Sequence, residues 1–140
     1  MYNNYIIDSC IDNKILCYNT NGKKLLYFTQ WDINQIITVS LSMPEGENTV
    51  KFYFSYRNEK EAIEVDANIN CNQEITAKVP NVLLQKSKDI HIYIHLINKT
   101  SGTTIAHIVF PVHKRPKPID YEYTDNVDVV YIKDLIKKLN

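Results

Sequence analysis

Four histidines are the side chains of this sequence best suited to metal or proton chemistry: His91, His95, His107 and His113. Zinc needs three or four ligands that converge within about 2.1 Å of one point. His91 and His95 are four residues apart on a predicted strand, roughly 13 Å, so they cannot share an ion. A simple hairpin after residue 97 places Tyr93 opposite His107, with His91 and His95 as diagonal neighbours. We expect an exposed aromatic and polar strand face suited to an interface, and no metal site.

The other reactive side chains form no recognisable catalytic arrangement. Serine and cysteine occur without a G-x-S-x-G turn, and no glycine-rich phosphate-binding loop is present. Acidic pairs within residues 59–66 are far more typical of a solvated strand face than of a glycosidase. Cys10, Cys17 and Cys71 lack C-x-x-C spacing, which argues against a disulfide framework or a zinc knuckle. We therefore expect no enzyme activity and no cofactor.

Composition describes one globular domain with no overall charge. Hydrophobic residues make up 44% of the 140, and 16 basic residues balance 16 acidic ones, so no net field attracts nucleic acid or an anionic membrane. The N-terminus lacks the basic segment and apolar core of a signal peptide, and no run approaches about eighteen apolar residues. Together with the thiol pattern, these features favour an intracellular origin.

The elements that carry these residues are predicted to be β-strands. Apolar and polar residues alternate with a period of two through most of the chain before residue 113. In residues 90–97 four aliphatic residues alternate with histidine and tyrosine, and residues 104–112 return with a matching apolar face. An Asn-Gly step at residues 21–22 favours a tight hairpin turn. Further strands are expected at 14–18, 24–28, 35–42, 50–56, 62–65 and 74–79.

Two long antiparallel strands that share one apolar face need a second sheet to cover it. No amphipathic helix that could do so occurs before residue 126. We therefore predict an all-β fold, an immunoglobulin-like antiparallel β-sandwich of about seven or eight strands over residues 1–113. The side chains expected at the centre of its core are Ile92, Ile94, Leu96, Ile108 and Phe110.

The pattern changes after Val112. Residues 113–118 read H-K-R-P-K-P, and two prolines do not fit a central strand, so residues 114–125 are predicted to form an extended arm. Apolar residues then recur at three- and four-residue steps, which predicts a short amphipathic C-terminal helix over residues 126–140. A helix of about three turns is marginal alone, so it must pack on the sandwich or on a partner.

The arm is the predicted interface with a neighbouring protein. Acidic residues directly follow its basic residues and cancel their field, which argues against nucleic acid. The alternative is that residues 114–140 return to their own sandwich and cover an edge strand. The candidate interface residues are Arg115, Pro116, Lys117, Pro118, Asp120, Tyr121 and Tyr123.

Three stretches resemble the N-terminal domain of the upper baseplate (BppU-like) family of phages and prophages of Gram-positive bacteria. They are residues 30–35 (QWDINQ), 76–85 (TAKVPNVLLQ) and 110–121 (FPVHKRPKPIDY), and the last, with its R-x-K-P-x-D-Y pattern, is the most specific. The resemblance implies an immunoglobulin-like sandwich, made in the host cytoplasm and built into the virion. It also implies a non-enzymatic role in anchoring tail fibres or receptor-binding proteins to the baseplate.

We therefore expect many symmetry-related copies whose partners are other virion proteins, and the charge balance leads us to expect no bound nucleic acid or membrane. Longer members continue past the D-Y pair into further domains, and this chain stops after one predicted helix, which favours a short adaptor. One alternative is a capsid decoration protein. Another is a carbohydrate-binding module for the host cell wall, because Trp31 and the tyrosines could stack on sugars. The place of Trp31 at a strand end before an apolar run favours core or inter-sheet packing instead.

Overall fold

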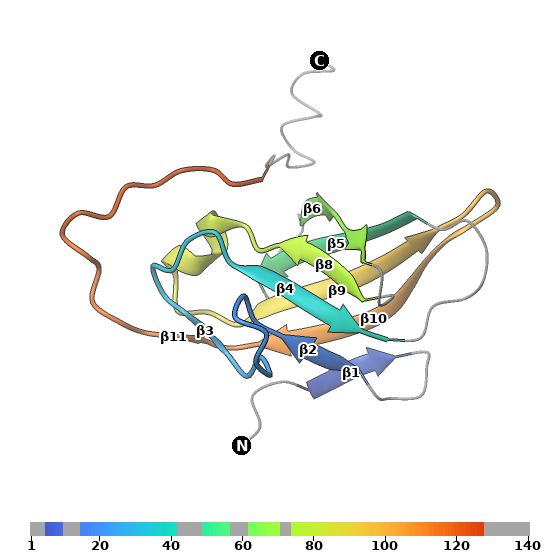
Figure 1. Ribbon diagram of the computed structural model, residues 1–140, viewed down its shortest axis with the longest axis horizontal. Coiled ribbons are helices and arrows are strands. Elements are labelled where there is room, and N and C mark those ends of the chain that lie inside the picture. The colour runs from blue at the N-terminus through green and yellow to red at the C-terminus, as the bar shows by residue number, and fades with distance from the viewer. Residues whose placement is uncertain (1–4, 10–14, 42–48, 57–61, 71–73, 128–140) are drawn as a thin grey trace, which may run out of the picture.

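The computed structural model describes residues 5–9, 15–41, 49–56, 62–70 and 74–127, and these are almost entirely β-structure (Figure 1). The elements in chain order are β1 (Tyr5–Ser9), β2 (Leu16–Tyr18), β3 (Phe28–Thr29), β4 (Ile36–Ser40), β5 (Thr49–Tyr56), β6 (Ile63–Asp66), β7 (Asn68–Ile69), β8 (Ile75–Lys78), the 3-10 helix η1 (Asn81–Gln85), β9 (Ile90–Ile97), β10 (Gly102–Phe110) and β11 (Val112–His113). None of the helical structure in this part of the chain is long and apolar enough to cross a membrane.

The strands form two antiparallel sheets and one short parallel pair. The larger sheet has the order β1-β10-β9-β5-β6, and the smaller has the order β2-β4-β8-β7. The parallel pair joins β11 to β3. The predicted all-β, antiparallel architecture is therefore confirmed, with β3 and β11 as the exception.

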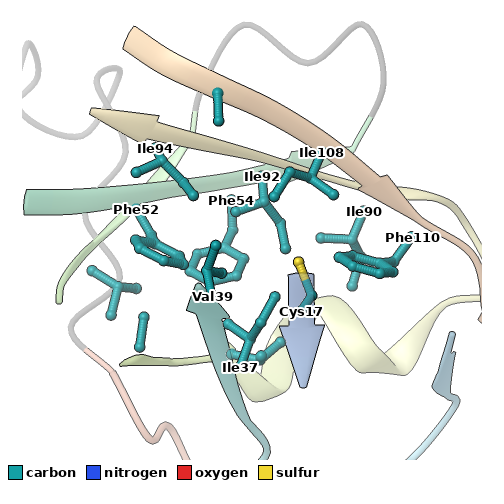
Figure 2. Close-up of a cluster of buried hydrophobic side chains, with 14 of the residues drawn as sticks. Cys17, Ile37, Val39, Phe52, Phe54, Ile90, Ile92, Ile94, Ile108 and Phe110 are labelled. Carbon is teal, nitrogen blue, oxygen red and sulfur yellow. The ribbon is translucent and has the colours of Figure 1, made fainter. Parts of the chain in front are cut away.

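The hydrophobic core lies between the two sheets. Figure 2 shows Ile37 and Val39 of β4 directed toward Phe52 and Phe54 of β5. All four side chains are essentially inaccessible to solvent, as alternation on each strand requires when one face is covered. The five side chains predicted at the centre of the core are buried, and Ile94 is 0% exposed.

The register of the long strands places the histidines as predicted. His107 lies directly opposite Tyr93, which in turn lies opposite Tyr53 of β5. A bulge between Thr104 and Ala106 interrupts the β9–β10 ladder and allows Ile105 as well as Ala106 to be buried.

The hairpin expected around Asn21–Gly22 is present as a turn, but its second strand is not where the pattern predicts it. Gly22 has a φ of 79°, and an isolated bridge joins Tyr18 to Lys24. The Leu25 N–H still donates to the Cys17 carbonyl at 2.8 Å, but residues 25–27 form no strand, and β3 pairs with β11 instead. Pro111, which has no N–H for an antiparallel ladder, separates β10 from β11, and its carbonyl accepts the Phe28 N–H at 2.9 Å.

Beyond β11 the described chain has neither helix nor strand. Figure 1 shows this segment, in orange and red, running away from β11 and returning above η1 and β8. Most of the helix predicted over residues 126–140 lies outside the described residues, and Asn126 and Val127 are not helical. Val127 packs against the core cluster.

Candidate functional site

The three stretches that carry the family resemblance meet at one end of the molecule. The loop between β3 and β4 contributes Trp31 and Asp32, η1 contributes Gln85, and the arm contributes Lys117 and Tyr121. These residues, with Arg115, are called the motif cluster below. They are far apart in the sequence, so the fold alone brings them together.

Trp31 is held in an unusual backbone conformation. Its φ of 73° lies in the left-handed region, which costs a bulky side chain of order 1–3 kcal/mol. The Trp31 N–H donates to the Leu84 carbonyl at 2.7 Å, and the Asp32 N–H donates to Thr29 at 3.3 Å, so the loop is fixed from two sides. The expectation that Trp31 packs in the core is wrong, because this geometry directs the half-buried indole to the arm.

Two basic residues of the arm, Arg115 and Lys117, contact side chains of their own chain. A guanidinium nitrogen of Arg115 lies 3.4 Å from a carboxylate oxygen of Asp32. The ammonium of Lys117 lies over the rings of Trp31 and Tyr121, 5.3 and 5.8 Å from their centroids. The two rings meet edge to face, with centroids 5.2 Å apart.

Asn81 joins the same segments through its backbone and its amide. Its side chain is 2% exposed, accepts the Asn34 N–H at 2.8 Å and donates to the Thr124 carbonyl at 2.7 Å. Its backbone N–H donates to the side-chain oxygen of Asn126, whose amide donates to the Val79 carbonyl. A buried amide satisfied in this way fixes the end of the arm against β8 and η1.

The predicted interface residues therefore divide into two sets. Arg115, Lys117 and Tyr121 contact their own domain, whereas Pro116, Asp120 and Tyr123 are exposed and Pro118 is half-buried. The Tyr123 hydroxyl donates to Asp125, within the arm itself.

Sequence reasoning missed Ile119, which is fully exposed in the turn that the Tyr121 N–H closes onto Pro118. It also missed Asp32 as the partner of Arg115. A fully exposed isoleucine next to charged residues gives no periodic signal that could have identified it.

The outer histidine–tyrosine face of the large sheet comprises Tyr53, His91, Tyr93, His95 and His107. Nδ1 of His91 lies 2.8 Å from Nε2 of His107, and the rings of Tyr93 and His107 stack with centroids 4.1 Å apart. This stack covers one face of each of the two rings.

The remaining histidine lies apart from this face. His113 stacks on Tyr27 with ring centroids 3.8 Å apart. Within the described ranges, no group of three or more histidine, cysteine or acidic side chains is arranged to hold a metal ion.

A charged network borders the same face. Glu64 accepts hydrogen bonds from the Lys51 ammonium at 3.0 Å and the Tyr53 hydroxyl at 2.8 Å. The bond from Lys51, and then the bond from Tyr53, hold the pKa of Glu64 below its ordinary value. The bond to Glu64 raises the pKa of Lys51, and burial followed by the same carboxylate raises that of Tyr53. Of these three side chains Glu64 is exposed, and Lys51 and Tyr53 are half-buried.

The thiol of Cys17 is buried and unreactive. It lies in the core, 2% exposed, and burial raises its pKa from 9.0 to about 12. A thiol that stays protonated at neutral pH is a poor nucleophile and a poor metal ligand.

Comparison of the chain with protein-family models, with curated proteins and with solved structures finds no match. The proposed function is therefore based on the arrangement of the motif cluster.

Proposed function

We propose that this protein is a non-enzymatic structural component of a phage virion, a baseplate or tail subunit that connects tail-fibre or receptor-binding subunits. The observation that supports this most directly is the motif cluster. Three stretches chosen only for their resemblance to the upper baseplate family contact one another through Asp32, Gln85 and Tyr121. Stretches that resemble a family by chance have no reason to meet in space.

The strand order supports the finer proposal of an immunoglobulin-like sandwich. In that fold one sheet has the order A-B-E-D and the other contains G-F-C, often with an added C′ strand. The order β2-β4-β8-β7 corresponds to the first sheet, and β10-β9-β5-β6 corresponds to the second. On this assignment β1 is an additional strand beside β10.

The docking surface is proposed to be the outer side of the arm. Because Arg115, Lys117 and Tyr121 are engaged by their own domain, a partner meets the side chains that the docked arm leaves exposed. Ile119 is fully exposed and Tyr123 is 43% exposed, and both can supply apolar contact area. Asp120, between them in the sequence, suits a partner with a basic group beside an apolar pocket.

The test is the incorporation of tagged variants into phage particles purified from an infected or induced host. Replacing Ile119 and Tyr123 by serine should lower incorporation at least about tenfold, since two apolar anchors are lost. The melting temperature should change little, because both side chains are exposed and the hydrogen bond of Tyr123 is made to Asp125 of the same arm. Ile69→Ser, at an equally apolar and 48% exposed position on β7, is the matched control. Normal incorporation of the double variant would refute this docking surface.

Deleting residues 114–140 tests whether incorporation into particles requires the arm. The expected product is a folded β-domain that no longer enters particles. If the truncated chain fails to fold, the tail is part of the core. That result would favour the alternative that the tail only covers its own domain. Specific binding to cell-wall glycans on an array, with no incorporation into particles, would replace the virion proposal by the carbohydrate-binding alternative.

A further inference from the structure

Trp31 and Tyr121 form an aromatic corner, two rings whose planes are 69° apart with centroids separated by 5.2 Å. The ammonium of Lys117 lies over both rings, within the distance of about 6 Å at which a cation is attracted to an aromatic face. A cation that contacts two ring faces is held as in the aromatic sites that bind ammonium ligands. The Lys117 side chain is nevertheless exposed, so the corner is open to solvent.

The aromatic corner is positioned by groups other than Lys117. The Trp31 N–H is bonded to the Leu84 carbonyl at 2.7 Å, which fixes the strained backbone that presents the indole. The amide of Gln85 donates to the Tyr121 hydroxyl at 3.2 Å, which orients the second ring. Because both rings are held by η1, the corner does not need the lysine in order to exist.

The surrounding charges also favour a cation. Asp32 follows Trp31 directly, and Asp120 and Glu122 flank Tyr121. Arg115 of the same arm is paired with Asp32, 3.4 Å away, and none of the described contacts joins it to either ring.

We propose that the aromatic corner of Trp31 and Tyr121 is a binding site for an alkylammonium group, and that Lys117 of the same chain is its resident occupant. A ligand or partner that carries a primary or quaternary ammonium group competes with Lys117 for this site. Its binding frees the lysine and loosens the first part of the arm from the domain. The site follows from the ring geometry alone and does not depend on the proposed virion role.

The competition sets the size of the expected effect. A solvent-exposed cation–π contact changes an equilibrium by about two- to fivefold. A ligand that must first displace Lys117 therefore binds the wild-type protein about three- to sixfold more weakly than a variant without the lysine.

The experiment uses the full chain and tetramethylammonium chloride as the probe. Trp31 is the one tryptophan of the sequence, so its fluorescence reports this site alone. Lys117→Ala should give a saturable change with tetramethylammonium, at a concentration about three- to sixfold lower than wild type. Sodium chloride at the same ionic strength should give no saturable change in fluorescence with either the wild type or Lys117→Ala.

Two controls separate the site from general salt effects. Lys114→Ala removes an exposed lysine of the same arm and should titrate like wild type. Tyr121→Leu combined with Lys117→Ala removes one ring and should abolish saturation. Melting curves verify that each variant is folded, and Lys117→Met provides a second neutral side chain if the alanine variant is not. Identical titrations of wild type and both neutral variants, or saturation that survives Tyr121→Leu, would overturn the proposal.

Discussion

The buried amide of Asn81 offers the sharpest test of how the arm is held. Its side chain makes two hydrogen bonds, one from the Asn34 N–H and one to the Thr124 carbonyl, so it connects the β3–β4 loop to the arm. Asn81→Ala removes both bonds without adding volume. We expect the variant to fold, to be less stable, and to expose the arm.

The magnitude follows from the two bonds. A typical intramolecular hydrogen bond contributes about 0.5–1.5 kcal/mol net, so losing two lowers the free energy of unfolding by about 1–3 kcal/mol. Asn34 and Thr124 are themselves exposed, so water can satisfy their backbone groups once the amide is gone and no larger penalty applies. For a chain of this size the melting temperature should fall by roughly 4–12 °C.

The assay combines urea unfolding with brief chymotrypsin treatment, which cuts after accessible aromatic residues such as Tyr121 and Tyr123. Cleavage in the arm should become faster in Asn81→Ala. Asn98→Ala is a matched control, because the Asn98 side chain likewise bonds two backbone groups: its oxygen accepts the N–H groups of Thr100 and Ser101, in an exposed hairpin loop. That variant should change stability less and leave arm cleavage unchanged.

A double-mutant cycle with Asn126 shows whether the arm docks as one unit. The Asn126 side chain accepts the Asn81 backbone N–H and donates to the Val79 carbonyl, so Asn126→Ala removes two different bonds. If either loss releases the arm, the double variant should be at least about 0.5 kcal/mol more stable than additivity predicts. A change below about 0.5 kcal/mol in Asn81→Ala, with unchanged cleavage, would refute the role given to this amide.

Three further outcomes follow from the core and the sheet surface. Ile94→Asp places a carboxylate at a position that is 0% exposed, and its circular dichroism should show no cooperative melting. Cys17, with a thiol pKa raised from 9.0 to about 12, should resist iodoacetamide at pH 8 in the folded protein and react in urea, as peptide mass spectrometry would show. The folded protein binds the Cys17 proton more tightly than the unfolded chain does. The free energy of unfolding is therefore unaffected by this thiol below pH 9 and decreases as the pH rises from 9 toward 12. Glu64→Gln should lower stability by less than about 1 kcal/mol, because the Glu64 carboxylate is itself exposed to solvent. With the pKa of Glu64 lowered in the folded state, that contribution is present above its ordinary value of 4.5 and fades as the pH falls further, so variant and wild type should converge in acid.

The sheet framework could be predicted from the sequence because it depends on local alternation. A period of two identifies both the strand and its buried face in β4 and β9, whereas in β5 aromatic residues on both faces leave the choice of buried face open. The opposition of Tyr93 and His107 follows from one hairpin and simple counting. The bulge between Thr104 and Ala106 cannot be predicted by this counting, because simple alternation does not indicate an extra residue in one strand.

The candidate site could not be predicted in the same way, because its contacts join segments far apart in the chain. Nothing local indicates that Trp31 has a positive φ, since a bulky aromatic residue is unfavourable there. The return of the arm depends on Asn81 and Asn126, two asparagines in a sequence rich in asparagine. Local pattern identified the arm as an extended segment and left open whether it meets a partner or its own domain.

Contact with the arm's own domain and contact with a partner involve different residues of the arm. Arg115, Lys117 and Tyr121, the most specific part of the resemblance, face the domain, so their chemistry explains why the arm docks. Ile119 and Tyr123 are exposed, so the proposed function assigns the selection of a partner to these two positions. Substitutions in the first set should therefore change arm docking and stability together, whereas substitutions in the second should change the partner and leave the domain intact. On this basis, relatives that share the cluster need not share a binding partner.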